Sequence, residues 1–181
     1  LNVLAPQIPG LRTDRSAYRK YYHARPMAHL VGYVGMAGKG EVDLDPVMRL
    51  PGFRAGRSGI EKTFDEQLRG TPGTRKFEVD SRGRVVRELG ATPSTPGKDL
   101  VLSIDHHLQT VAQERLKEHR VASVVVLDVE TGGILALAST PTFDPNDVVF
   151  RVDPKTWGRI ARAKDQPLQN RAIRGQYPPG S

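Results

Sequence analysis

The sequence predicts an α+β fold in which helices pack on antiparallel sheets, and three observations support this. Two pairs of strand-like segments flank short turns, at 76–89 and at 123–138. Apolar residues recur with helical spacing in separate stretches near 60–68, 105–116 and 154–161. In the second half the resulting order of strand, helix, strand, strand and helix favours an α+β domain.

A linker-like stretch at 91–98 suggests that the chain has two domains. It is rich in Pro, Ser, Thr and Gly and has no apolar periodicity. The charge balance also changes there, because residues 1–98 carry 17 Lys and Arg against 10 Asp and Glu, whereas residues 99–181 carry 10 against 10. We therefore predict one domain at 1–95 and a second, incomplete one at 96–181.

The elements expected in the first half follow from local patterns. The segment 30–35 is β-prone, with glycines that allow close backbone approach. Ser58 and Glu61 form a capping-box pattern before a helix whose apolar residues recur at 60, 64 and 68, and Gly70 is suited to end it. The segments 76–80 and 84–89 flank a Ser-Arg-Gly turn, which predicts a hairpin.

The elements of the second half begin with a predicted strand at 100–104. Asp105 is placed to cap a helix with one apolar stripe, formed by Leu108, Val111, Ala112 and Leu116. The runs 123–129 and 134–138 surround a Thr-Gly-Gly turn and predict an antiparallel hairpin that is central in its sheet. Asp153-Pro154 predicts a further helix start, with Trp157, Ile160 and Ala161 on one face.

Composition and motifs exclude several classes of function. Cysteine is absent, so disulfides and thiolate sites are excluded. The arginines are scattered and no nucleic-acid-binding motif occurs, so a solvated basic face is the default reading of the charge. His106 and His107 are adjacent on a helix and diverge, while His23 and His29 lack a third ligand at metal-binding spacing. We expect no metal and no cofactor, and we interpret Asp144 and Asp147 as part of an Asx turn.

The last five residues, Tyr-Pro-Pro-Gly-Ser, contain the best candidate for chemistry. The prolines preset the backbone, and a serine that opens a helix lies where free N–H groups favour a developing negative charge. This arrangement suits an acyl-transfer nucleophile, although for the pentapeptide taken alone a polar loop end is the better explanation. The candidate is Ser181.

A resemblance to a known family covers nearly the whole chain. The runs 168–181 and 125–146 resemble the first catalytic motif and the opening hairpin of the transpeptidase domain in class B penicillin-binding proteins. The runs 28–35, 56–62, 68–73 and 80–85 resemble their non-catalytic, dimerisation- or pedestal-type module. The elongation-specific members are the better match, and the division-specific paralogue is the alternative. The resemblance implies an N-terminal non-catalytic module followed by the first part of a transpeptidase domain.

The resemblance implies a D,D-transpeptidase that cross-links peptidoglycan stem peptides through an acyl-enzyme on Ser181 and that is acylated by β-lactam antibiotics. The base expected in an S-x-x-K motif, and the later motifs, would follow Ser181. The chain stops at Ser181, so we expect it to be an inactive piece of a longer protein. Its anchor would precede Leu1, on the periplasmic face of the bacterial inner membrane.

Two other roles stay open at this stage. The first half is a candidate recruitment module for an elongation scaffold protein and a glycosyltransferase partner. If its basic excess binds an acidic partner, reversing Arg54, Arg57 and Arg69 should weaken that binding, unless these arginines are merely solvated. A catalytically dead homologue that senses β-lactams is the remaining alternative.

Overall fold

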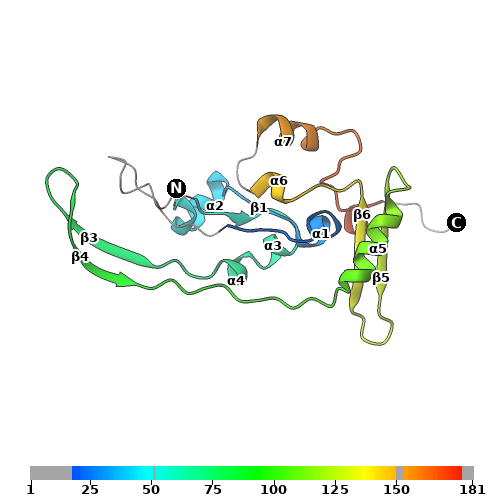
Figure 1. Cartoon of the computed structure of the whole chain (residues 1–181), viewed down its shortest axis with the longest axis horizontal. Coiled ribbons are helices and arrows are strands. Elements are labelled where there is room, and N and C mark those ends of the chain that lie inside the picture. Colours follow the sequence, from blue (N-terminus) through cyan, green and yellow to red (C-terminus); the bar gives the residue numbers. More distant parts are fainter. Residues whose placement is uncertain (1–17, 51, 150–152, 177–181) are drawn as a thin grey trace, which may run out of the picture.

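The computed structural model describes residues 18–50, 52–149 and 153–176. We call residues up to 95 the first half and later residues the second half. In Figure 1 a long hairpin extends from the first half as an arm; residues 105–140 of the second half lie at the opposite end of the molecule, and residues 146–149 and 154–161 (α6 and α7) lie above its middle. The elements of the first half are α1 (Ala24–Val31), β1 (Val34–Gly35), α2 (Lys39–Leu44), the 3₁₀ helix η2 (Pro46–Arg49), β2 (Ala55–Gly56), α3 (Gly59–Thr63), α4 (Asp65–Arg69), β3 (Thr74–Val79) and β4 (Val85–Thr92). Those of the second half are α5 (His106–Leu116), β5 (Ala122–Leu127), β6 (Ile134–Thr140), α6 (Asn146–Val149), α7 (Pro154–Ala161) and α8 (Arg171–Arg174).

The structure corrects three local predictions in the first half. The predicted strand at 30–35 is wrong for Leu30 and Val31, which end α1, and only β1 pairs with β2. The predicted capping box is also wrong. Ser58 precedes α3 without a side-chain capping bond, and Glu61 turns instead toward the Arg19 guanidinium, 2.8 Å away, and the Tyr21 hydroxyl. The single helix expected at 60–68 is split into α3 and α4, and Gly70 ends α4 with φ +66° as expected.

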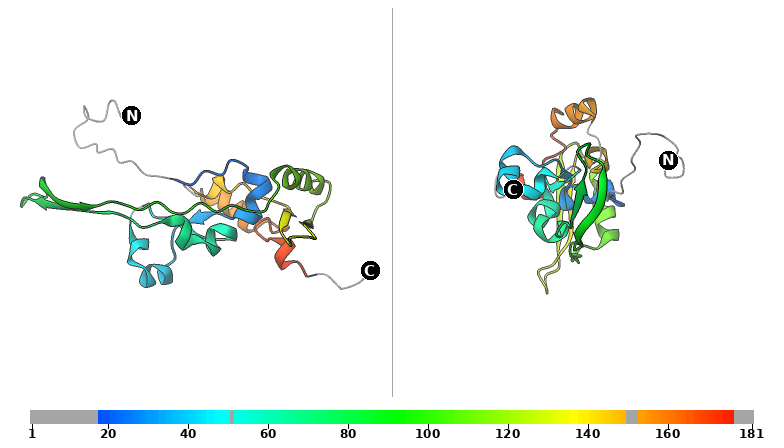
Figure 2. Two further views of the ribbon diagram at one scale, coloured as in Figure 1. Left: turned by 90° about the horizontal axis from the view of Figure 1, so that it is seen from below. Right: turned by 90° about the vertical axis from the view of Figure 1, so that its left-hand side faces the viewer.

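The arm confirms the hairpin predicted at 76–89. β3 and β4 pair antiparallel with two register shifts, and every residue of both strands is exposed. Asp80 fixes the turn, because its Oδ1 accepts hydrogen bonds from the backbone N–H groups of Arg82 and Arg84. Figure 2 shows the arm from a second direction, again clear of the other elements.

The second half keeps its predicted helix and hairpin but not its first strand. The Asp105 side chain accepts a hydrogen bond from the Leu108 N–H at 2.9 Å, which confirms the cap of α5. Leu116 and Ala112 are buried against β6, whereas Val111, expected on the same stripe, is 41% exposed. The strand predicted at 100–104 is wrong: this segment lies outside every strand, although Asp105 N–H just after it donates to Leu135 O.

The β5–β6 hairpin forms as predicted, but among the described residues no further strand pairs with it, so the predicted central position is not seen there. The two strands pair from Ala122↔Thr140 to Leu127↔Ile134, and α5 covers one face. Within the described residues the sheet has only these two strands, so Val125 and Leu127 stay about half exposed. The inner end of β6 is buried, from Ala136 to Thr140.

One apolar cluster joins the two halves. It contains Ala28 of α1 together with Phe143, Val148 and Ile160, and Tyr33, Trp157 and Leu168 pack against it. Asp153 caps α7 as predicted by accepting from Thr156 N–H, although Ala161 is exposed. Among the described residues no helix is long and apolar enough to cross a membrane. The α+β prediction is confirmed.

Candidate functional site

Helix α8 leads the chain toward the predicted nucleophile. The Asn170 side chain caps this short helix, since its Oδ1 accepts from Ala172 N–H at 3.1 Å. The backbone beyond α8 is described as far as Gln176. Ser181 itself lies outside the described residues, so the structure defines the approach to the candidate nucleophile and not its side chain.

Arg171 fixes α8 in place. Its side chain is buried, and the guanidinium donates to three backbone carbonyls of the preceding loop, those of Asp165, Gln166 and Gln169. Gln166 has a φ of +45°, which is uncommon for a residue with a side chain. Because Arg171 binds the carbonyl of that residue and of its neighbours, it holds the tight loop closed. The Arg171 backbone N–H donates to the buried Ser139 Oγ at 3.0 Å, which ties α8 to β6.

Two glutamines of α5 hold β6 from its other side. Gln109 is fully buried, and its amide both donates to Leu137 O at 2.9 Å and accepts from Leu137 N–H at 2.7 Å. The same Nε2 donates to Pro26 O of α1 at 2.7 Å. Gln113 donates to Ser139 O at 3.3 Å. The edge of β6 is thus satisfied by side chains, as buried backbone groups require.

His29 is the main polar contact between α1 and the loop that precedes α8. Its imidazole is buried, lies edge-on to the Phe143 ring at 5.6 Å and contacts Pro167 O at 2.8 Å through Nε2. A carbonyl can only accept, so Nε2 carries the proton. Burial lowers the pKa of His29 below its ordinary value and the Arg171 cation acts in the same direction, whereas the bond to Pro167 opposes both. The ring is therefore neutral at pH 7.

The sequence-predicted site residues do not converge on a single centre. The turn after β6 confirms the Asx interpretation, because Asn146 N–H donates to Asp144 Oδ1 at 2.8 Å. His106 begins α5 and lies beside the His23 ring, 3.8 Å between centroids. In the described part of the chain, no three His, Cys, Asp or Glu residues are grouped so that they could hold a metal ion.

Sequence reasoning alone missed the residues that hold β6 and α8 in place. Gln109 and Gln113 lie at helical spacing with Ala112 and Leu116, and a polar residue repeated on an apolar stripe signals a buried hydrogen-bonding role. Asn170 before a short helix is likewise a capping signal. Arg171 offers no local signal, because its role depends on the backbone carbonyls of the loop that folds around its guanidinium.

Comparisons with known proteins agree with this architecture. The model of the penicillin-binding protein dimerisation domain matches residues 1–102, and that of the penicillin-binding protein transpeptidase domain matches residues 122–181. The peptidoglycan D,D-transpeptidase MrdA of Acinetobacter baumannii is 40% identical over 97% of this chain, which spans 26% of that relative. The chain thus covers about a quarter of the length of this curated relative.

Two solved structures have the same fold. One is a complex between penicillin-binding protein PBP2 and MreC from Helicobacter pylori, with a TM-score of 0.78 and 26% identity over 94% of this chain and 32% of that one. The other is Pseudomonas aeruginosa PBP2 in complex with WCK 5153, with a TM-score of 0.70 and 34% identity over 94% of this chain and 33% of that one. The resemblance inferred from the sequence is confirmed: the chain belongs to the penicillin-binding protein family, as a dimerisation domain followed by the start of a transpeptidase domain.

Proposed function

We propose that the chain is part of an elongation-type peptidoglycan D,D-transpeptidase in which Ser181 is the nucleophile. The observation that supports this most directly is the fixed placement of α8, which Arg171 and Asn170 hold just before the segment with Ser181. The similarity to MrdA and PBP2 proteins supports the reaction and the elongation subtype. We propose a domain boundary between residues 95 and 96 and a location on the periplasmic face of the inner membrane.

The proposed reaction is a two-step acyl transfer. The Ser181 oxygen attacks the carbonyl carbon of the D-Ala-D-Ala bond, an ester forms, and the terminal D-alanine leaves. An amine of a neighbouring stem peptide then attacks the ester, which makes the cross-link and restores the serine. Serine is weakly nucleophilic at neutral pH and needs a base, the role that S-x-x-K enzymes of this type give to a lysine or to a nearby group.

Intact-mass measurement of the full-length protein after incubation with a penicillin tests this proposal. We expect the wild-type protein to gain the mass of one drug molecule and the Ser181→Ala protein to gain none. Ser94→Ala, which removes an exposed serine from the linker-like stretch, should react like the wild type. Undiminished labelling of Ser181→Ala would reject Ser181 as the nucleophile, and no labelling of a folded wild-type protein would reject the transpeptidase reading.

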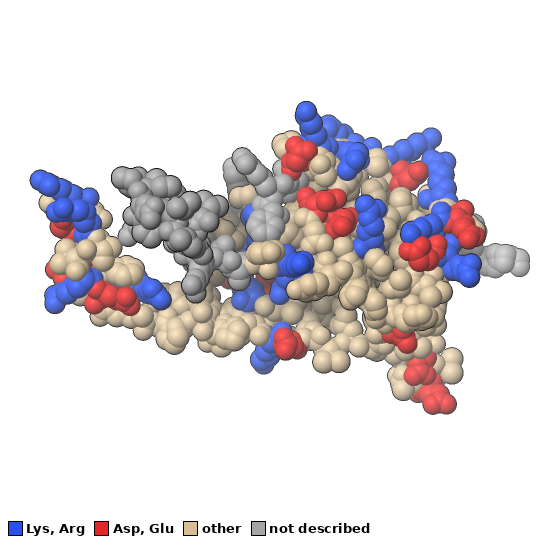
Figure 3. Space-filling model, in the orientation of Figure 1, with Lys and Arg blue, Asp and Glu red and all other residues tan. Residues whose placement is uncertain are grey.

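We also propose that the first half recruits an elongation scaffold protein and a glycosyltransferase partner. The PBP2 of H. pylori was solved in complex with MreC, which supports a scaffold partner. The arm supports a docking role, because two-stranded hairpins are marginally stable alone and this one leaves Phe77, Val79 and Val85 about half exposed on one face. In Figure 3 the arm carries Lys and Arg side chains together with Asp and Glu side chains.

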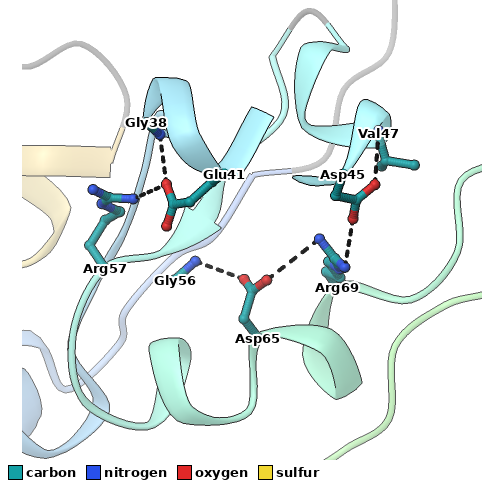
Figure 4. Close-up of polar contacts among 8 residues, drawn as sticks. All are labelled: Gly38, Glu41, Asp45, Val47, Gly56, Arg57, Asp65 and Arg69. Atoms are coloured by element: carbon teal, nitrogen blue, oxygen red, sulfur yellow. Dashed lines mark hydrogen bonds and ion pairs between the residues drawn. The ribbon is translucent and has the colours of Figure 1, made fainter. Parts of the chain in front are cut away.

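The structure changes the residues with which this recruitment should be tested. In Figure 4, Arg57 binds Glu41 and Arg69 binds Asp45, with distances of 2.5 and 2.8 Å between the charged groups. Reversing the charge of these arginines would break ion pairs within the first half. A loss of partner binding could then result from a disturbed fold and would not identify a partner contact. On the arm, Arg84 and Arg87 pair with acidic neighbours.

Three cations of the arm are better probes of an acidic partner. Arg75, Lys76 and Arg82 have exposed side chains and form no ion pair with the described residues. We expect their joint replacement by Glu to raise the Kd of the full-length protein for its MreC-type scaffold about tenfold and to flatten its dependence on salt. Biolayer interferometry at two salt concentrations measures both effects.

A matched triple reversal on another surface is the control for this experiment. It uses three exposed cations at and just after α7, Lys155, Arg159 and Arg162. We expect this variant to bind the scaffold within about twofold of the wild type. Equal weakening by both triple variants would mean that net charge, and not the arm, determines binding.

A further inference from the structure

One side chain joins α1 of the dimerisation domain to the helix before Ser181. The Oδ1 atom of Asn170 accepts from Ala172 N–H and caps α8, while its Nδ2 donates to His29 O of α1 at 3.2 Å. The two hydrogen bonds are made by the two polar atoms of one amide group: the oxygen accepts one and the nitrogen donates the other. The placement of α1 and the direction in which α8 begins are therefore set by one planar group.

A second contact makes this connection specific. The His29 imidazole binds Pro167 O at 2.8 Å, so both the backbone and the side chain of His29 bind the short stretch 167–170. On the opposite side, the Arg171 backbone N–H binds Ser139 Oγ of β6. Both attachments are made at the N-terminal end of α8, which is only one turn long, so a shift of either is expected to change the direction in which α8 runs.

We propose that Asn170 is a positioning residue for acyl transfer, which transmits the placement of α1 to the segment that carries Ser181. This inference rests on the proposed function of Ser181. Acyl transfer requires the nucleophile to be held close to its productive geometry, and a misplacement of about 1 Å can cost about 100-fold in rate. Asn170 acts through the backbone of α8 and makes no contact with the reacting atoms.

The variant Asn170→Asp isolates the link to α1. Aspartate caps a helix as well as asparagine does, so the bond from Ala172 N–H is kept, but an oxygen then faces the His29 carbonyl in place of the N–H donor. We expect the limiting rate of acylation of the full-length protein by a fluorescent penicillin to fall about tenfold. The dissociation constant of the non-covalent complex should stay within about twofold, because binding surfaces are unchanged. Stopped-flow fluorescence over a range of drug concentrations separates the two quantities.

Asn146 provides a matched control. Its side chain also bridges the two halves, with Nδ2 donating to Tyr21 O at 2.9 Å and Oδ1 accepting from Tyr21 N–H at 3.0 Å, but it lies on α6 and away from α8. We expect Asn146→Ala to leave the limiting acylation rate within about twofold of the wild type. Asn170→Ala, which removes both bonds, should acylate at least as slowly as Asn170→Asp.

Each other outcome rejects part of the interpretation. A wild-type rate in Asn170→Asp, or a loss that appears only in the dissociation constant, would overturn the positioning role. An equal loss in Asn146→Ala would assign the effect to general docking of the two halves and also overturn it. If the wild-type protein is not acylated at all, the proposed function itself fails, and this failure is visible before any variant is compared.

Discussion

Arg171→Ala is expected to lower the free energy of unfolding of the chain by about 3 kcal/mol. The substitution removes a buried guanidinium that satisfies the carbonyls of Asp165, Gln166 and Gln169, and it leaves a cavity beside β6. The tight turn at Gln166 would lose the contact that closes it. Urea unfolding followed by fluorescence of the single tryptophan, Trp157, measures the change.

Two variants define the cause of this effect. Arg174→Ala removes an exposed arginine three positions further along α8 and should change stability by less than about 0.5 kcal/mol. Arg171→Lys keeps the charge, but a lysine ammonium cannot reproduce the planar fork that reaches several carbonyls, so it should recover only part of the loss. A neutral Arg171→Ala would mean that the loop before α8 is held by other contacts.

Gly32→Ala should destabilise the chain by more than about 4 kcal/mol. Gly32 has a φ of +80°, and a Cβ at this position would lie 1.9 Å from the carbonyl oxygen of Ser58. Neither atom can move without separating α1 from α3, because the obstacle is backbone and not a flexible side chain. Urea unfolding, or failure to obtain folded protein at all, reports this result.

Gly83→Ala separates the cost of a positive φ from the cost of the steric clash that Gly32→Ala creates. Gly83 also has a positive φ, +76°, but no atom lies within 4 Å of a Cβ built there. Its replacement should therefore cost only the conformational penalty of about 1–2 kcal/mol. If the two variants were equally destabilised, the close approach of residues 32 and 58 would play no part in stability.

The elements predicted correctly from the sequence are those that depend on near neighbours. Asp105 and Asp153 cap their helices with bonds to N–H groups three residues away, and both hairpins form around turns that their own residues stabilise. Such interactions are encoded within a few positions. The capping box, a prediction that failed, was changed by distant partners. Glu61 left its expected cap for Arg19 and Tyr21, which lie about 40 residues away.

The candidate site shows the same difference between features encoded locally and features that depend on distant residues. Ser181 was predicted from a resemblance between ordered motifs. The partners of Gln109 and Arg171 could not be predicted, because both residues bind groups that only the tertiary fold brings near. The interpretation of two of the arginines considered as partner contacts also changes because of tertiary neighbours. Arg57 and Arg69 looked solvated in the sequence, and the fold supplies their acidic neighbours.

The contacts of α1 have a consequence for the order of events during synthesis. His29 finds its partners Pro167 and Asn170 at separations of 138 and 141 residues. At about 5–20 residues per second, the ribosome needs roughly 7–28 s to add that length of chain. During this interval α1 exists without the groups that bury His29 and complete its packing. We therefore expect this early segment to be a preferred target of chaperones and proteases while translation continues, and to become protected only when the α8 region has emerged.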